Sequence, residues 1–372
     1  MYEPERTTAH DMQYKNKIFS LPQNRVWRSY LGGKMLDRLV GKTEPEDSHF
    51  PEDWIASVTA ASNPDSKNEL EGISPVEVDG QKLLLPELIA KDPEYFLGAE
   101  HVARFGQQPM VLIKLLDAAV RLQLQAHPTA EFAKQHLGSN SGKAEAYYIL
   151  SVRDDVTDPY VYLGFQRPPD RNTLKTWIEA QDLKAILGCF DKIRVKPGDV
   201  LFIPGGVPHA IGEGIFMVEI MEPSDLVVRF EFERAGYTLP ESARFMNRGL
   251  DFCIDIFDLQ PMPESLVRSE YMFDPQLEAT YHETAHRYRL IDPETTPRFQ
   301  VKKTVLKGSL TREENTFFTG VVVDGACVVK TNAGEVKLDT LDKFFCPAGL
   351  GSYTIEADAE VHILECFPPA AS

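Results

Sequence analysis

The stretch from Arg194 to His209, RVKPGDVLFIPGGVPH, most constrains how this chain can fold. An apolar run from Val200 to Ile203 follows a Pro-Gly-Asp turn and leads into Pro204-Gly205-Gly206. The pattern predicts a buried β-strand that ends in a tight corner, with His209 directly after the corner. A surface hairpin that ends in a chance histidine is the simpler alternative, but it leaves the polar residues upstream unexplained.

The spacing of these residues, G-x5-P-x-G-x2-H, resembles the second signature of the cupin superfamily. Cupins are small β-barrels that hold a metal inside, so the resemblance implies that His209 faces a barrel interior. A similar corner recurs at Phe345 to Ser352, with Ser352 in the place of His209. This echo predicts a second, metal-free barrel, although a Pro-Gly turn of an ordinary β protein explains it equally well.

Composition limits the possible partners. The chain has 372 residues, 43% of them hydrophobic, which is enough for two or three domains with cores of their own. A net charge of −17 disfavours nucleic acid and acidic membranes as partners, so an anionic substrate would need a local basic pocket. Five scattered cysteines without a CxxC pair, and no apolar signal or membrane-spanning run, predict a cytoplasmic location.

Hydrophobic patterns predict a mainly β fold. Buried strands are expected over 110–117 and 122–128, and an all-β region is expected from Phe299 onward. One helix is expected from about Asp170 to Leu187, and another is expected to begin at Pro240. The first twenty or so residues are polar and are expected to attach loosely.

These elements suggest two cupin-type (jelly-roll) β-barrels with a helical insertion and connecting helices. The expected domains are a metal-binding catalytic barrel over 1–235 with its insertion near 170–187, a helical connecting region over 236–298, and a metal-free β domain over 299–372. The number of copies in the active assembly is left open.

Potential metal ligands gather around the predicted strands. Gln125 and His127 are two residues apart on one strand, so their side chains leave the same face. Glu145 follows later and shares a face with Lys143. With His209 they offer two imidazoles, a carboxylate and an amide oxygen, which suit zinc with an open position, although manganese, iron or cobalt could also bind.

Each of these residues has an ordinary explanation when it is taken alone. His127 precedes a proline and could be a capped or surface histidine, and Glu145 could be a solvated carboxylate. The combination of four such residues is what supports a metal site.

Four segments carry a more specific resemblance, over roughly residues 25 to 232. They are QPMVLIKLLDAAVRLQLQAHP, GKAEAYY, PGDVLFIPGGVPHA and VEIMEPSDLVVR. Their order and spacing resemble those of the successive motifs of type I mannose-6-phosphate isomerases, and Trp54 in EDWIAS resembles an early block of that family.

The resemblance implies a zinc-dependent enzyme that interconverts mannose 6-phosphate and fructose 6-phosphate through a cis-enediol intermediate. It places Gln125, His127, Glu145 and His209 on the zinc ligands. It places the catalytic groups at Arg229, Lys143, Glu219 and Asp225, and substrate-binding groups at Lys114, Gln123 and Trp54.

The chemistry of an aldose–ketose isomerase is compatible with these residue types. A base must carry a proton between C1 and C2 while the charge on the intermediate is stabilised. A zinc ion can polarise the sugar oxygens as a Lewis acid. Arg229 could hold the developing oxyanion, while Lys143, Glu219 or Asp225 moves the proton.

Two departures from the family pattern concern the phosphate. Gln123 stands where the family has a phosphate-binding serine, and a lysine expected after Arg229 is missing, with only Arg234 nearby. The FEFER segment after Arg229 is also acidic. A related or non-phosphorylated sugar, or a non-catalytic sugar-binding cupin, therefore remains an alternative.

A different enzyme class is suggested by His282-Glu283-Thr284-Ala285-His286, which fits the HExxH signature of zinc peptidases. That signature works only on a helix, where both histidines share a face. The flanking residues alternate as they would in a strand, and no third ligand follows, so the peptidase is a remote alternative.

Overall fold

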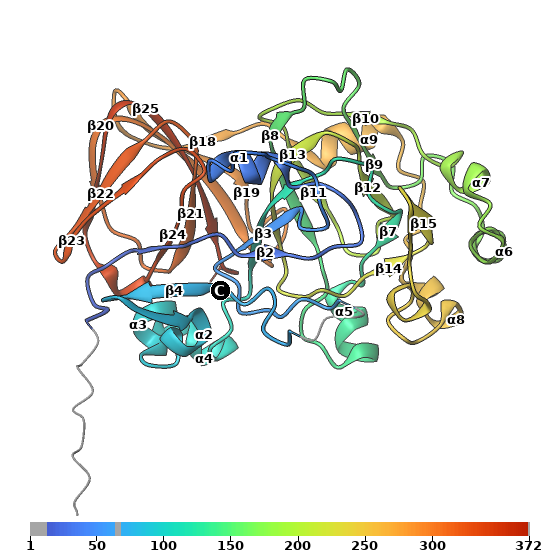
Figure 1. Ribbon diagram of the computed structural model, residues 1–372, viewed down its shortest axis with the longest axis horizontal. Coiled ribbons are helices and arrows are strands. Elements are labelled where there is room, and N and C mark those ends of the chain that lie inside the picture. Colours follow the sequence, from blue (N-terminus) through green and yellow to red (C-terminus); the bar gives the residue numbers. More distant parts are fainter. Residues whose placement is uncertain (1–12, 64–67, 371–372) are drawn as a thin grey trace, which may run out of the picture.

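The computed structural model describes residues 13–63 and 68–370 of the chain. These residues form three larger antiparallel sheets and two separate hairpins, with short helices around them (Figure 1). The mainly β class predicted from the sequence is confirmed. Within the described residues, no helix is long and apolar enough to cross a membrane.

A seven-stranded sheet forms one wall of the site. Its strands, in spatial order, are β17 (Met272–Phe273), β11 (Val200–Ile203), β8 (Glu145–Val152), β13 (Ile215–Met221), β6 (Leu112–Asp117), β3 (Glu52–Ile55) and β2 (Arg25–Val26). The register aligns Trp54, Lys114, Glu219 and Tyr147 in one row across β3, β6, β13 and β8. The strand predicted at 200–203 is confirmed, and the strand predicted over 110–117 is present over 112–117.

A five-stranded sheet forms the opposite wall. Its strands are β10 (Ile193–Arg194), β9 (Tyr160–Leu163), β12 (His209–Ile211), β7 (Gln125–Ala126) and β14 (Val228–Arg229). Gln125 pairs with His209 on one side and with Arg229 on the other. The strand predicted over 122–128 is thus reduced to two residues, but it brings three predicted site residues into one row.

Residues 276–367 form eight strands of a nine-stranded sheet, and these strands are drawn in orange and red in Figure 1. The main path of this sheet is β1 (Phe19–Ser20), β24 (Lys343–Cys346), β21 (Phe318–Asp324), β25 (Tyr353–Phe367), β20 (Gln300–Arg312), β19 (Ala285–Ile291) and β18 (Gln276–His282). Off this path, β22 (Cys327–Thr331) pairs with β25, and β23 (Gly334–Leu338) pairs with β22. The all-β region predicted from Phe299 is confirmed.

This sheet takes strands from outside the predicted boundaries. Strands β18 and β19 lie inside 236–298, which was expected to be a helical connecting region. Side chains alternate along these residues, and this pattern favours a β-hairpin over a helix. Strand β1 pairs with β24, so residues 19–20 are firmly attached, contrary to prediction. Residues 1–12, also expected to be loose, lie outside the described part of the chain. The division into domains stays a prediction.

Both predicted helices are interrupted. The first is two helices, α6 (Arg171–Ala180) and α7 (Leu183–Leu187), because Gln181 adopts a left-handed conformation at φ 51°. Asp170 caps α6 as expected, by accepting from the backbone N–H groups of Asn172 and Thr173. Figure 1 shows the pair at the far end of the molecule from the C-terminal sheet.

The helix expected from Pro240 is absent over most of its length. A 3-10 turn, η2 (Glu241–Ala243), is followed by a loop in which Met246 and Asn247 have positive φ, and α8 (Leu250–Cys253) begins after Gly249. A right-handed helix cannot continue through residues with positive φ. The apolar residues of this segment still face inward, because Leu250, Cys253 and Ile254 are buried in one apolar cluster.

The remaining elements surround these sheets. They are α1 (Lys34–Leu39), β4 (Pro75–Val78), β5 (Gln81–Leu84), α2 (Leu85–Ile89), α3 (Pro93–Leu97), α4 (Ala99–Phe105), α5 (Ala130–Phe132), η1 (Ala133–Leu137), β15 (Glu233–Arg234), β16 (Tyr237–Thr238), η3 (Ile254–Ile256), α9 (Glu264–Glu270) and η4 (Ala348–Leu350). One buried apolar cluster includes Ile113 and Val218 of the seven-stranded sheet and Val301 and Phe345 of the nine-stranded sheet. These two sheets therefore share a core.

Candidate active site

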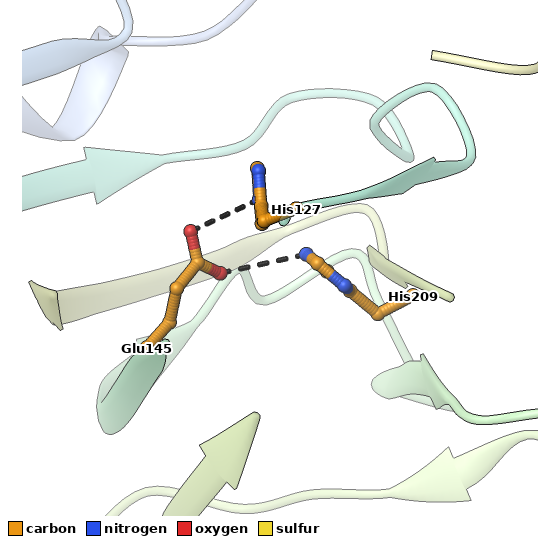
Figure 2. A group of neighbouring side chains, drawn as sticks. All are labelled: His127, Glu145 and His209. Atoms are coloured by element: carbon orange, nitrogen blue, oxygen red, sulfur yellow. Dashed lines mark ion pairs between the residues drawn. The ribbon is translucent and has the colours of Figure 1, made fainter. Parts of the chain in front are cut away.

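Three of the four predicted metal ligands meet between the two facing sheets. Nε2 of His127 lies 3.1 Å from Oε1 of Glu145, and Nε2 of His209 lies 3.4 Å from Oε2 (Figure 2). All three side chains are fully buried. Within the described residues, this is the group of His, Cys, Asp and Glu side chains whose ligand atoms lie close enough to hold a metal ion.

The hydrogen bonds of the imidazoles fix which nitrogen can bind a metal. Nδ1 of His127 lies 2.8 Å from the carbonyl oxygen of Leu226, and Nδ1 of His209 lies 2.8 Å from that of Val207. A carbonyl only accepts, so each Nδ1 must donate, and each neutral ring then turns an unprotonated Nε2 toward Glu145. Lone pairs on nitrogen and carboxylate oxygen would face each other there, which is an arrangement that a cation between them stabilises.

The electrostatics of the group fit the same donor set. Burial, with the charge of Lys143, lowers the pKa of His127 to about 3, so its ring is neutral at pH 7. Burial alone would raise the pKa of Glu145, but the positive charge of Lys143 lowers it. A neutral imidazole and a carboxylate are ligand forms that zinc requires.

The predicted fourth ligand lies beside this group. The amide nitrogen of Gln125 is 3.2 Å from Nε2 of His209. The amide oxygen and nitrogen exchange places when the amide flips, so Gln125 can offer its oxygen to an ion held by the histidines. Lys143 lies 3.3 Å from Oε1 of Glu145, and the hydroxyl of Tyr147 donates to Oε2 at 2.7 Å.

A small cavity adjoins the candidate metal group. It encloses about 30 Å³, about the volume of one water molecule. All but one of the other predicted site residues line it, namely Lys114, Gln123, Gln125, Lys143, Glu219, Asp225 and Arg229. Trp54 is the exception: it is fully buried behind the cavity, with the charged groups of Lys114 and Arg28 each 4.9 Å from its ring centre.

A buried ion network forms the floor of the cavity. Nζ of Lys114 lies 3.0 Å from Glu219 Oε2 and 3.5 Å from Glu52 Oε2. Glu52 also accepts from Tyr30 OH at 2.6 Å and from Trp54 Nε1 at 2.7 Å. Lys114, predicted to bind the substrate, therefore already shares its charge with two carboxylates.

Four residues of this network were not predicted from the sequence: Arg28, Ser29, Tyr30 and Glu52. The first three are consecutive in the loop after β2, all are buried, and all line the cavity. A signal was present, because Arg28 stands in the otherwise uncharged run VWRSYLGG, and Glu52 stands two residues before Trp54 on β3. Alternation places Glu52 and Trp54 on the same face.

The remaining predicted residues lie at the outer side of the cavity. Asp225 accepts hydrogen bonds from both terminal nitrogens of Arg28, at 3.0 and 3.1 Å. Arg229 donates to the carbonyl oxygen of Ala243 at 3.1 Å. Asp225, Val227 and Arg229 also line an open hollow of about 500 Å³ on the other side. These three residues form the wall between the hollow and the cavity.

The peptidase motif lies elsewhere. His282 ends β18 and His286 lies in β19, the two strands of one hairpin, with His282 and Glu283 exposed. The motif is not helical, so its histidines lack the shared helical face that the peptidase signature requires. The structure thus gives no support to the remote alternative.

Comparisons with known proteins agree with this arrangement. No protein-family model matches the chain. The mannose-6-phosphate isomerase ManA of Bacillus subtilis is 26% identical over 257 residues, which cover 68% of this chain and 74% of that protein. A mannose-6-phosphate isomerase of Streptococcus mutans is 34% identical over 143 residues, which cover 37% of this chain and 43% of that protein.

Solved structures show the same fold. The mannose 6-phosphate isomerase from Bacillus subtilis superposes with a TM-score of 0.70 at 20% identity, covering 94% of this chain and 99% of that one. A mannose 6-phosphate isomerase bound with zinc and yttrium gives 0.64 at 16% identity, covering 95% and 100%. The chain is therefore a relative of the mannose-6-phosphate isomerases, and the resemblance found in its motifs is confirmed.

Proposed function

We propose that this chain is an aldose–ketose isomerase that interconverts mannose 6-phosphate and fructose 6-phosphate through a cis-enediol intermediate. The observation that carries the proposal is the meeting of His127, Glu145 and His209, with facing lone pairs, next to a cavity lined by Lys143, Glu219 and Arg229. The names of the related proteins support the same reaction.

The donor set fits zinc, held by His127, Glu145, His209 and the amide oxygen of Gln125. A bound zinc ion would supply Lewis-acid polarisation of the sugar oxygens. Manganese, iron or cobalt could also bind to the same nitrogen and oxygen ligands.

We assign the transfer of the proton between C1 and C2 of the sugar to Glu219 or Lys143 rather than to Asp225. Both oxygens of Asp225 accept from Arg28; burial alone would raise its pKa, but Arg28 lowers it to about 2, so this carboxylate stays ionised. Burial, together with the negative charges of Glu145 and Glu52, raises the pKa of Glu219 despite the nearby Lys114. A raised pKa suits a carboxyl group that both accepts and donates a proton near neutral pH.

The charges around the cavity favour an anionic substrate. When Glu219 is ionised, the four cations Arg28, Lys114, Lys143 and Arg229 balance the four carboxylates Glu52, Glu145, Glu219 and Asp225. A divalent metal would leave this balance at about +2, which a phosphate dianion neutralises. The sugar would approach through the outer hollow, since the inner cavity has no room for it without movement of the wall.

The proposal is tested by assaying purified protein of known metal content on mannose 6-phosphate, fructose 6-phosphate, free mannose and other aldoses. Conversion of mannose 6-phosphate that disappears with a chelator and returns with zinc is expected. Conversion of free sugars alone would mean that the substrate is a non-phosphorylated sugar and that the reaction is still an aldose–ketose isomerisation. No conversion of any sugar would overturn the proposal.

The variant Arg229→Ala distinguishes an enzyme from a non-catalytic sugar-binding protein. We expect this variant to keep its metal and to lose most of its turnover, because Arg229 would stabilise charge that develops in the reaction. We also propose a cytoplasmic location, which the five buried, unpaired thiols support.

A further inference from the structure

Arg28 is the cation that joins the most groups around the cavity. Its Nε lies 2.9 Å from Glu52, and its two terminal nitrogens reach both oxygens of Asp225. The side chain is 4% exposed and lies over the ring of Trp54. It comes from the loop between β2 and α1, so it bridges β3 of the seven-stranded sheet and the segment before β14.

Two carboxylates at the cavity depend on this one guanidinium. Without Arg28, Asp225 would still accept a hydrogen bond from the backbone N–H of Ser62, which lies 2.8 Å from its Oδ2. Glu52 would retain Tyr30, Trp54 and the more distant Lys114. The wall of the cavity would then carry one more negative charge than positive charges.

We propose that Arg28 is a specificity-determining residue: its single positive charge offsets the negative charge of Asp225, and it shares Glu52 with Lys114, so that the cavity accepts a dianionic sugar phosphate rather than only a neutral sugar. This inference rests on the proposed function, because it concerns the substrate of the same site. It assigns Arg28 a role in the charge of the site and no step of the reaction.

The effect should be large for a dianion and small for a neutral sugar. Two unit charges about 7 Å apart at an effective dielectric constant of about 20 interact strongly enough to change binding more than tenfold. In Arg28→Met we therefore expect the KM and Kd for mannose 6-phosphate to rise by about tenfold or more, and the Kd for free mannose to change by less than about threefold.

Two further variants separate charge from shape. Arg28→Lys keeps the positive charge and should recover most of the affinity for mannose 6-phosphate. Arg28→Met combined with Asp225→Asn removes one charge of each sign, so binding of mannose 6-phosphate should return toward that of the unmodified protein even if turnover does not.

Arg287→Met is the matched control. Arg287 also lies between two carboxylates, Glu365 and Glu314, with a side chain that is 7% exposed, but in the nine-stranded sheet. Any general effect of losing a buried arginine on folding should appear in both variants, whereas a change in Kd for the phosphorylated sugar should appear only in Arg28→Met.

Calorimetric binding of mannose 6-phosphate, inorganic phosphate and mannose to the metal-loaded protein distinguishes the outcomes. Binding of the phosphorylated sugar that weakens in Arg28→Met and returns in the double variant supports the inference, whether or not the protein isomerises the sugar. Equal weakening of mannose and mannose 6-phosphate, or no recovery in either Arg28→Lys or the double variant, overturns it. Absence of turnover with intact, Arg28-dependent binding would count against the proposed reaction alone.

Discussion

The two imidazoles at the site are held in one tautomer by main-chain carbonyls. Because Leu226 and Val207 accept from the Nδ1 atoms of His127 and His209, the unprotonated Nε2 atoms and the carboxylate of Glu145 are brought together without a proton between them. Burying these acceptors costs free energy unless something positive lies among them. The folded chain should therefore be more stable with a metal than without one.

Zinc removal tests this expectation. Thermal unfolding should occur several degrees lower after chelation, because a ligand at about 100 times its Kd stabilises a fold by roughly 3 kcal/mol. Zinc should restore the midpoint, and Glu145→Gln, which removes the charged ligand, should abolish the shift. An unfolding midpoint that does not respond to zinc in the unmodified protein would count against a metal at these residues.

Asp225 gives a pH-dependent contribution to stability. Its pKa in the folded chain is about 2, below the usual value near 4, so its contribution is fully present above pH 4 and is lost as pH falls toward 2. The full contribution is roughly 2 kcal/mol, and about 1 kcal/mol of it should be lost by pH 3. Urea unfolding at pH 5 and pH 3 should show this loss in the unmodified protein and a smaller loss in Asp225→Asn. Equal losses in both proteins would contradict the assignment.

At the scale of single elements, the corner after β11 sets the position of His209. Gly205 lies against the loop that follows His127: a Cβ at Gly205 would be 2.8 Å from Cα of Thr129 and 2.9 Å from the carbonyl oxygen of Pro128. Glycine is needed here for close approach of two backbones, so the corner and the strand end that carry the histidines are packed directly against each other.

Gly205→Ala should therefore disturb both histidines. We expect a loss of roughly 1 to 3 kcal/mol in the free energy of unfolding, as in other overpacked interiors, together with weaker zinc binding. Gly188→Ala is a suitable control, because its added Cβ would come no closer than 3.1 Å to its neighbours at the end of α7. Urea unfolding and zinc titration measure the two effects, and unchanged zinc affinity in Gly205→Ala would show that the corner does not position the ligands.

Elements with strong local signals could be predicted from the sequence. The apolar run at β11, the turn before it and the Asp170 cap each depend on neighbouring residues, and all three are present. The breaks at Gln181 and at Met246–Asn247 depend on left-handed backbone angles at residues other than glycine, which carry little signal in a sequence. Likewise, the partners of Arg28, 24 and 197 residues away, follow only from how the sheets come together.

At the scale of the whole molecule, the nine-stranded sheet is joined to the site-bearing sheets by more than a linker. The shared apolar cluster is one connection. A second is the buried pair of Lys343 on β24 and Asp53 on β3, with 2.5 Å between Nζ and Oδ2. Asp53 lies between Glu52 and Trp54, so this contact ties the C-terminal sheet to the strand that supports the floor of the cavity.

A double-mutant cycle measures this connection. Lys343→Met leaves the carboxylate of Asp53 buried and without its cation, so we expect a loss of about 3 to 5 kcal/mol in the free energy of unfolding. Asp53→Asn leaves Lys343 buried in the same way, whereas the double variant removes both charges and should be clearly more stable than the sum of the two single effects predicts. Lys330→Met, which breaks an exposed pair with Glu356 in the same sheet, should change stability little. Unfolding in urea, followed by circular dichroism, gives all four values. Additive effects of Lys343→Met and Asp53→Asn would mean that the two sheets are held together by their apolar contacts and that this ion pair contributes nothing of its own.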